Sequence, residues 1–139
     1  MGLDMYLNGR KYFNTFTPDG KEIKRDTHDG FEVEALELRI GYWRKHAPLH
    51  TFIVEEVHGG EDDCQPIELE YHQLLDIADA LRNNRLPSNE DCEGFFFGGS
   101  SIWDEHRADA EENATIFEKA AAWLKQNPFW NSVVYTASW

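Results

Sequence analysis

The densest group of chemically versatile side chains is the run Tyr42–Lys45, which is followed by His46 and His50. Arg44 offers a planar fork of donors, Lys45 a point charge and the neighbouring tryptophan a stacking face, so this run could hold an anion. The alternative is a strand end whose aromatic residues lie in the core and whose cations pair with nearby acids. That alternative is the commoner outcome for a run of charges, because most surface charges are simply solvated.

Two histidines four residues apart would share one face of a helix, as in a two-histidine metal motif. Here, however, Pro48 separates His46 from His50, and we expect the helix to begin at the proline. A third ligand would have to come from the acidic turn 61–64, which is near in sequence but not predictably near in space. We therefore expect no metal site and no bound cofactor.

The acidic turn 61–64 places Asp63 and Cys64 shortly after a Gly-Gly pair. Carboxylates there could bind a divalent cation, and the cysteine could act as a nucleophile beside a base such as His50. The spacing matches neither a calcium loop nor a cysteine-centred motif. An acidic turn with a buried, inert cysteine is the alternative interpretation.

A glycine-rich stretch at 94–101 surrounds three phenylalanines and precedes a predicted helix with Asp104 and Glu105 in its first turn. Flexible glycines followed by free helix amides could form an anion-binding nest. No lysine follows, as it would in a phosphate loop, and the two acids would repel a phosphate. We interpret residues 95–97 as a short buried strand between glycine hinges.

The composition restricts both the partners and the compartment. The 139 residues include 26 acidic and 13 basic side chains, which gives a net charge of −13. Such a surface repels phosphate backbones and anionic lipid, so we expect neither direct nucleic-acid binding nor membrane binding. Two cysteines, no signal-peptide pattern and no long apolar run together predict a cytoplasmic protein with free thiols.

The hydrophobic periodicity predicts strands and helices that alternate in one domain over residues 1–139. Strands are predicted near 3–7, 31–42, 67–71, 95–97 and 133–137, and helices at 48–58, 74–82 and 100–127. Their one-sided polarity favours an α+β fold, a mainly antiparallel sheet of about five strands with three helices packed on it. A change of apolar phase at 35–36 predicts a β-bulge in the long strand.

Several short motifs occur together along nearly the whole chain. They are GLDMYL at 2–7, YWRK at 42–45, LH at 49–50, DDC at 62–64, LP at 86–87, GFFFG at 94–98, WDE at 103–105 and SW at 138–139. In these motifs the chain resembles a family of small proteins encoded by bacteriophages and by bacterial genomes that carry prophages. The segments 46–48 and 52–53 depart from the family pattern.

The resemblance implies a phage accessory protein made in the cytoplasm of the bacterial host cell, and it carries over no catalytic roles. It draws attention to polar motif residues that packing explains poorly. These binding candidates are Asp4, Arg44, Lys45, His50, Asp63, Cys64 and Asp104.

We expect a non-catalytic protein that binds a host or defence-system protein, given the small size, the acidic surface and the phage-like motifs. An acidic inhibitor that mimics nucleic acid is one version of this hypothesis, and its charge would come from five acids of the third helix, Asp104, Glu105, Asp109, Glu111 and Glu112. The alternative is a small enzyme or ligand-sequestering protein for an anionic, nucleotide-like molecule. In that case His50 would act as acid or base and Arg44 would anchor the anion. A third candidate is a virion component that assembles into an oligomer.

Overall fold

A computed structural model describes residues 2–13, 16–62, 64–87 and 105–138. Its centre is a four-stranded antiparallel sheet in the order β4-β1-β6-β5. These strands are β1 (Asp4–Tyr12), β4 (Ala35–Arg44), β5 (Ile67–Glu68) and β6 (Asn131–Ser138). A separate two-stranded ribbon pairs β2 (Thr27–His28) with β3 (Phe31–Glu32). The α+β fold class predicted from the sequence is therefore confirmed.

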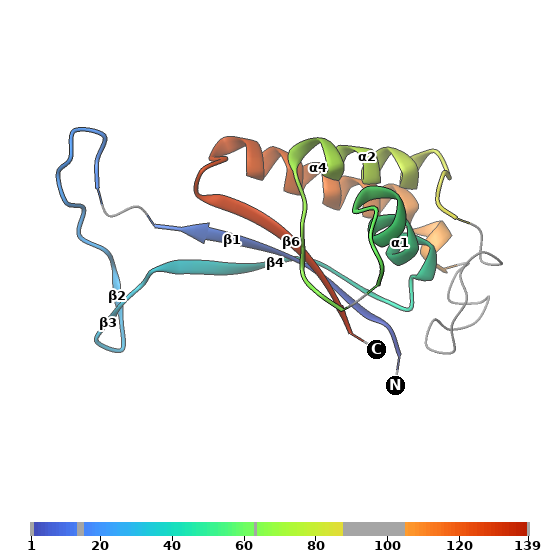
Figure 1. Cartoon of the computed structure of the whole chain (residues 1–139), viewed down its shortest axis with the longest axis horizontal. Coiled ribbons are helices and arrows are strands. Elements are labelled where there is room, and N and C mark those ends of the chain that lie inside the picture. The colour runs from blue at the N-terminus through green and yellow to red at the C-terminus, as the bar shows by residue number, and fades with distance from the viewer. Residues whose placement is uncertain (1, 14–15, 63, 88–104, 139) are drawn as a thin grey trace.

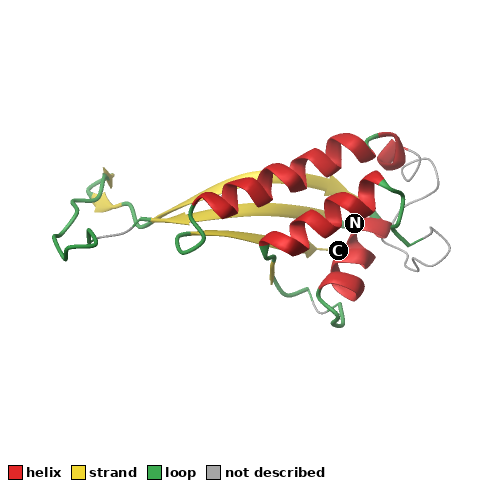
Figure 2. Cartoon of the chain, turned by 90° about the horizontal axis from the view of Figure 1, so that it is seen from above, coloured by secondary structure: helices red, strands yellow, loops and turns green. Residues whose placement is uncertain are grey.

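The described helices cover one face of the sheet, and none of them lies on the other face (Figures 1 and 2). They are α1 (Ala47–Thr51), its π-helical continuation η1 (Phe52–Val57), α2 (Tyr71–Arg82) and α4 (Ala110–Gln126). A further helical turn at 105–108 precedes α4. Backbone bonds from Asp109 to Glu105 and from Asn113 to Asp109 connect this turn to α4.

The alternation of side chains along the strands explains the two faces of the sheet. Met5 and Leu7 in β1 are fully buried on the helix side, whereas Tyr6 between them is turned to the open side. Val133 and Tyr135 in β6 follow the same pattern. The buried apolar side chains form one cluster between the sheet and the helices.

Beyond the helices, the β1–β4 pair continues into an arm, residues 12–13 and 16–38, which projects from the body and includes β2 and β3 (Figure 1). Little of the described chain packs against this arm, so large apolar side chains along it stay exposed. They are Tyr12, Phe16, Ile23, Phe31, Leu36 and Leu38.

The β-bulge lies in β4, but not where the sequence predicts it. The extra residue is Ile40, which stands between Arg39 and Gly41, the partners of two consecutive β1 residues. The change of apolar phase at 35–36 marks the start of β4 instead. A phase change signals either a bulge or a strand boundary, and the sequence pattern alone does not distinguish them.

The predicted strand at 67–71 is shorter in the structure because Glu70 already caps α2. Its backbone N–H donates to Gln73 Oε1 at 2.8 Å, which is one half of a capping box. The helix predicted after Pro48 and the last strand are present as α1–η1 and β6. The predicted strand at 95–97 and the predicted helix start at 100–104 lie outside the described residues.

Candidate functional site

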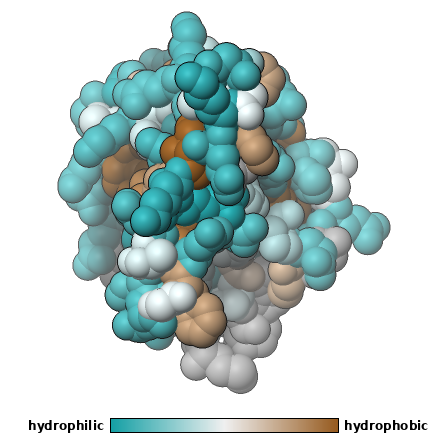
Figure 3. Space-filling model, turned by 90° about the vertical axis from the view of Figure 1, so that its left-hand side faces the viewer, coloured by the Kyte–Doolittle hydropathy of each residue, from teal (hydrophilic) through white to brown (hydrophobic). Residues whose placement is uncertain are grey.

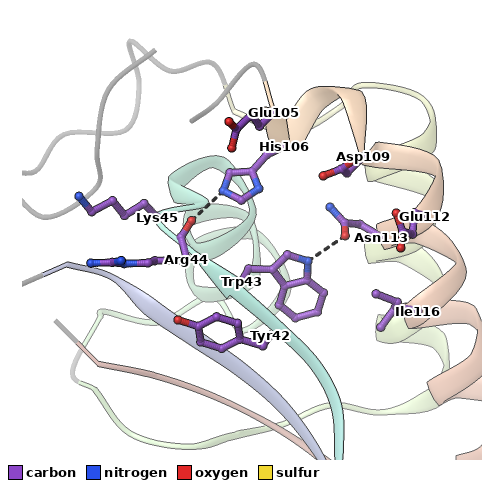
Figure 4. A pocket seen from close by; sticks show the side chains of 10 residues that line it. All are labelled: Tyr42, Trp43, Arg44, Lys45, Glu105, His106, Asp109, Glu112, Asn113 and Ile116. Carbon is purple, nitrogen blue, oxygen red and sulfur yellow. Dashed lines mark hydrogen bonds between the residues drawn. The ribbon is translucent and has the colours of Figure 1, made fainter. Parts of the chain in front are cut away.

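A cleft of about 500 Å³ opens at the end of β4, between that strand and the helical stretch 105–116 (Figure 4). This volume is typical of small-molecule sites, which span roughly 300–1,000 Å³. The cleft is lined by Tyr42, Trp43, Arg44, Lys45, Glu105, His106, Asp109, Glu112, Asn113 and Ile116. Of the candidates predicted from the sequence, it brings together Arg44 and Lys45.

A hydrogen bond between Trp43 and Asn113 joins the two sides of the cleft. The indole Nε1–H donates to Asn113 Oδ1 at 2.9 Å, and the indole ring stacks on Phe117 with 5.2 Å between ring centroids. Because an indole nitrogen can only donate, it determines which end of the Asn113 amide faces it. The other end, Nδ2, is buried without a hydrogen-bond partner in a residue that is 6% exposed. Such a donor costs about 1–3 kcal/mol, part of which a ligand acceptor would recover.

The charged side chains at the end of β4 and those on the helix point in different directions. Arg44 pairs with Asp4, so its side chain lies on the open side of the sheet, and Figure 4 shows Arg44 and Lys45 extending away from the helix. Neither forms a side-chain hydrogen bond or ion pair with another described residue. On the helix side, the same holds within the described chain for Glu105, Asp109 and Glu112, which are three or four residues apart and therefore share one helix face.

Lys45 has an unusual backbone conformation, with φ at +56°. Glycine adopts this left-handed region freely, whereas a residue with a Cβ is strained there. The conformation turns the chain from β4 into α1, and the Lys45 N–H donates to the Leu3 carbonyl at 2.7 Å. Strain of this kind gathers at functional sites, where it is tolerated for the sake of a side-chain position.

His46 caps α1 and stacks on His106 at the edge of the cleft. Its Nδ1 accepts from the Leu49 N–H at 3.4 Å, and the two imidazole rings lie 4.2 Å apart and nearly parallel. Burial, and to a smaller extent the neighbouring His106, lowers the pKa of His46 to about 3. The ring is therefore neutral near pH 7, and its buried Nε2 has no partner. His106 in turn donates from Nε2 to the Arg44 carbonyl at 2.7 Å.

His50, the predicted acid or base, lies in the core instead of the cleft. It is 2% exposed, and its Nδ1 and Nε2 lie 2.5 Å from Tyr135 Oη and from Asp62 Oδ2. Burial, and secondarily the Asp62 carboxylate, raises the pKa of the Tyr135 hydroxyl well above its usual value. We call Tyr135, His50 and Asp62 the buried His50 chain, after its buried imidazole, although the Asp62 side chain at its outer end is 33% exposed. Polar side chains that supply one another's hydrogen-bond partners stabilise the fold. Because His50 is buried, a substrate has no access to its imidazole.

The remaining predicted candidates do not gather at one place. Asp4 lies on the open side of the sheet and accepts from the Tyr42 hydroxyl at 2.6 Å, a bond that raises the Tyr42 pKa. Cys64 forms no disulfide and is exposed, so the expectation of a buried cysteine in the acidic turn is wrong. Asp63 and Asp104 lie outside the described residues. The sequence-based hypothesis of one pocket around His50 and Arg44 is therefore wrong as to His50.

The cleft includes two residues that sequence reasoning missed, Asn113 and His106. A signal for Asn113 was present, because it lies four residues after Asp109 and four before Phe117, on the apolar stripe of the helix. A polar residue on such a stripe needs a buried partner. His106 carried no comparable signal, since its importance comes from a stack with a residue 60 positions earlier.

No group of three His, Cys, Asp or Glu side chains in the described part of the chain is arranged to hold a metal ion. His46 and His50 face different partners. None of the described helices is both long and apolar enough to cross a membrane. Comparisons with family models, with curated proteins and with solved structures find no match. The interpretation of the site therefore depends on its own geometry.

Proposed function

We propose that this chain is a non-catalytic binding protein that engages another protein along the arm and the outer edge of β4. The phage-like motifs suggest a host or defence-system protein as the partner. One observation supports the proposal above all: large apolar side chains are exposed along a strand edge that no other described strand covers.

The exposed apolar residues of β4 lie where the helix layer ends. A Cβ at Gly9 would contact Trp123 of α4, so this position of β1 faces the helices. Leu38 is the β4 partner of Gly9 and therefore lies on the same, helix side of the sheet. Leu36, two residues earlier, shares that side. The two leucines are 43% and 40% exposed because α4 does not reach them. Viewed from the arm, brown and tan patches interrupt the hydrophilic surface (Figure 3).

An edge strand is a ready template for a partner chain, because its outward N–H and C=O groups are unpaired. The first position in the sheet order belongs to β4, so among the described strands only β1 pairs with it. On the arm, Phe31 is 77% exposed and Phe16 is 54% exposed. In a chain of net charge −13, these apolar residues favour a protein contact over simple solubility.

The version in which the acids of the third helix mimic nucleic acid loses one of its five charges, because Glu111 pairs with Arg82 of α2 and that bond lowers the pKa of Glu111. Glu105, Asp109 and Glu112 form no ion pair with another described residue. The enzyme alternative also loses its acid or base, because His50 is enclosed in the buried His50 chain.

The proposal is tested by capture of a partner from a bacterial host lysate with the tagged chain, followed by native mass spectrometry. The double variant Leu36→Lys, Leu38→Lys should lose a partner of definite mass that the wild type retains. The matched control is Leu75→Lys, since Leu75 is an equally exposed leucine on α2, away from the arm. Retention of the partner by the double variant, or no partner for the wild type, would contradict the proposal.

A further inference from the structure

The backbone groups of β4 that face away from the sheet belong to Glu37 and Arg39. In an antiparallel pair, successive residues bond alternately toward the neighbouring strand and away from it. The Phe13 N–H donates to the Glu34 carbonyl at 3.1 Å, so residue 34 and every second residue up to Leu38 bond toward β1. The N–H and C=O groups of Glu37 and Arg39, which flank Leu38, therefore point to the free edge.

This free stretch of edge is short and has a definite limit at each end. The Val33 N–H points in the same direction, but it already donates to the Asp26 carbonyl at 2.8 Å. At the other end, the bulge at Ile40 bends the strand and interrupts the regular ladder. Residues 35–39 therefore remain for pairing, and no other described strand lies against them.

The side chains of this stretch complement themselves when two copies meet antiparallel about Leu38. Glu37 of one copy then lies opposite Arg39 of the other, and the two-fold symmetry repeats this contact. Both side chains are on the open side of the sheet, as are their β1 partners, Arg10 and Asn8. On the helix side, Leu38 faces its own counterpart. Opposite charges and apolar side chains in facing positions each stabilise an antiparallel pair.

Both charges remain available to a second copy. Arg39 donates to Asn8 and lies over the Tyr6 ring, but it forms no ion pair with a described acid. Glu37 lies 3.3 Å from Arg10, and its side chain is still 63% exposed. The net charge of −13 on each copy opposes association, but at about 0.15 M salt the Debye length is about 8 Å, so charges near the contact dominate.

We propose that the free protein forms a symmetric dimer, in which two β4 strands pair antiparallel about Leu38 and join the two sheets. Each Glu37 exchanges two backbone hydrogen bonds and one ion pair with the facing Arg39, because both residues direct their backbone groups outward. This role of the second copy rests on the function proposed above, because it concerns the same edge. The second copy covers the exposed leucines there until a host partner displaces it, and it removes the uncontrolled association that unpaired strand edges invite.

The test is sedimentation equilibrium of the purified full chain, at concentrations from about 10 µM to about 1 mM in about 0.15 M salt. The average mass should rise with concentration from that of one chain toward twice that value. Glu37→Arg and Arg39→Glu should each dimerise at least about tenfold more weakly, because both symmetric contacts become like-charge pairs. A wild type that stays monomeric throughout this range would overturn the proposal.

An equimolar mixture of the two variants distinguishes pairing about Leu38 from other modes of association. The Glu37→Arg copy carries two arginines at the contact, and the Arg39→Glu copy carries two glutamates. The mixture should therefore recover the wild-type affinity as a mixed dimer, although neither variant dimerises well alone. The matched control is Glu68→Arg, a charge reversal at an exposed residue of β5 on the opposite edge of the sheet, and it should dimerise as the wild type does. No gain of association on mixing, or single variants that dimerise as tightly as the wild type, would overturn the proposal.

Sedimentation of the purified chain does not depend on the capture of a host protein, so the two proposals can fail separately. A monomeric chain that retains a host partner would overturn the dimer and leave the proposed function intact. A dimer that captures no host partner would do the reverse.

Discussion

His50 lies close in sequence to the cleft residues Arg44 and Lys45, but the two sites differ in how completely the fold supplies hydrogen-bond partners for their side chains. In the buried His50 chain, both imidazole nitrogens have partners at 2.5 Å, and the residue is 2% exposed. In the cleft, Asn113 Nδ2 has no partner, and the charges of Arg44 and Lys45 are unpaired within the described structure. The comparison teaches that a satisfied network holds the fold together, whereas unsatisfied groups beside an open space are the better candidates for binding.

Removal of the central residue of the buried His50 chain should have the largest effect on stability. His50→Ala leaves a cavity and removes the hydrogen-bond partner of the Tyr135 hydroxyl. Tyr135 is 1% exposed, so water does not replace that partner. We expect the free energy of unfolding to fall by about 3 kcal/mol, measured by urea denaturation. His72→Ala, at an exposed histidine of α2, is the control and should change it by less than about 1 kcal/mol. A loss of similar size in both variants would remove the structural role assigned to His50.

The next effect is a dependence of stability on pH that comes from His46. Its pKa is about 3 in the folded protein and ordinarily near 6.5, so the unfolded chain binds more protons between these values. The His46 contribution is therefore fully present above pH 6.5 and is lost progressively as the pH falls toward 3. Between pH 7 and pH 5 we expect a loss of about 2 kcal/mol from this residue.

His46→Asn keeps a side-chain acceptor for the Leu49 N–H but removes the titrating ring. Its unfolding free energy should therefore vary less between pH 7 and pH 5 than that of the wild type. His28→Asn, at an exposed histidine of the arm, should retain the wild-type profile. An unchanged profile in the His46 variant would show that other groups control acid stability.

The smallest effect separates the backbone of Lys45 from its side chain. At φ +56°, Lys45→Gly should be more stable than Lys45→Ala by about 1 kcal/mol, because the alanine Cβ is strained there. Thermal unfolding of the two variants measures the difference. Equal stabilities would show that the positive φ of Lys45 does not strain a residue with a Cβ.

The sequence predicted the layers of the fold better than the site. Alternation in β1 and β6, Pro48 near the start of α1 and the stripe that includes Phe117 were readable, because they reflect local geometry. The position of the bulge at Ile40 was not, since it depends on the register between β1 and β4. Register is decided by contacts between strands that the apolar pattern of one strand does not specify.

The site was only half predictable for a related reason. Arg44 and Lys45 stood out as adjacent cations in an acidic chain, and the structure places both at the cleft. His50 stood out equally, but its role depends on Tyr135, which lies 85 residues later in the chain. Residue type indicates what a side chain can do, whereas only its neighbours in space decide whether that capacity is already occupied.

The most direct test of the central claim compares partner capture from a bacterial host lysate by the wild type and by the Leu36→Lys, Leu38→Lys double variant, with native mass spectrometry as the readout. We predict that the wild type retains a partner of definite mass and that the double variant loses it, because the exposed leucines of β4 are part of the contact. A partner that both chains retain equally would contradict the account.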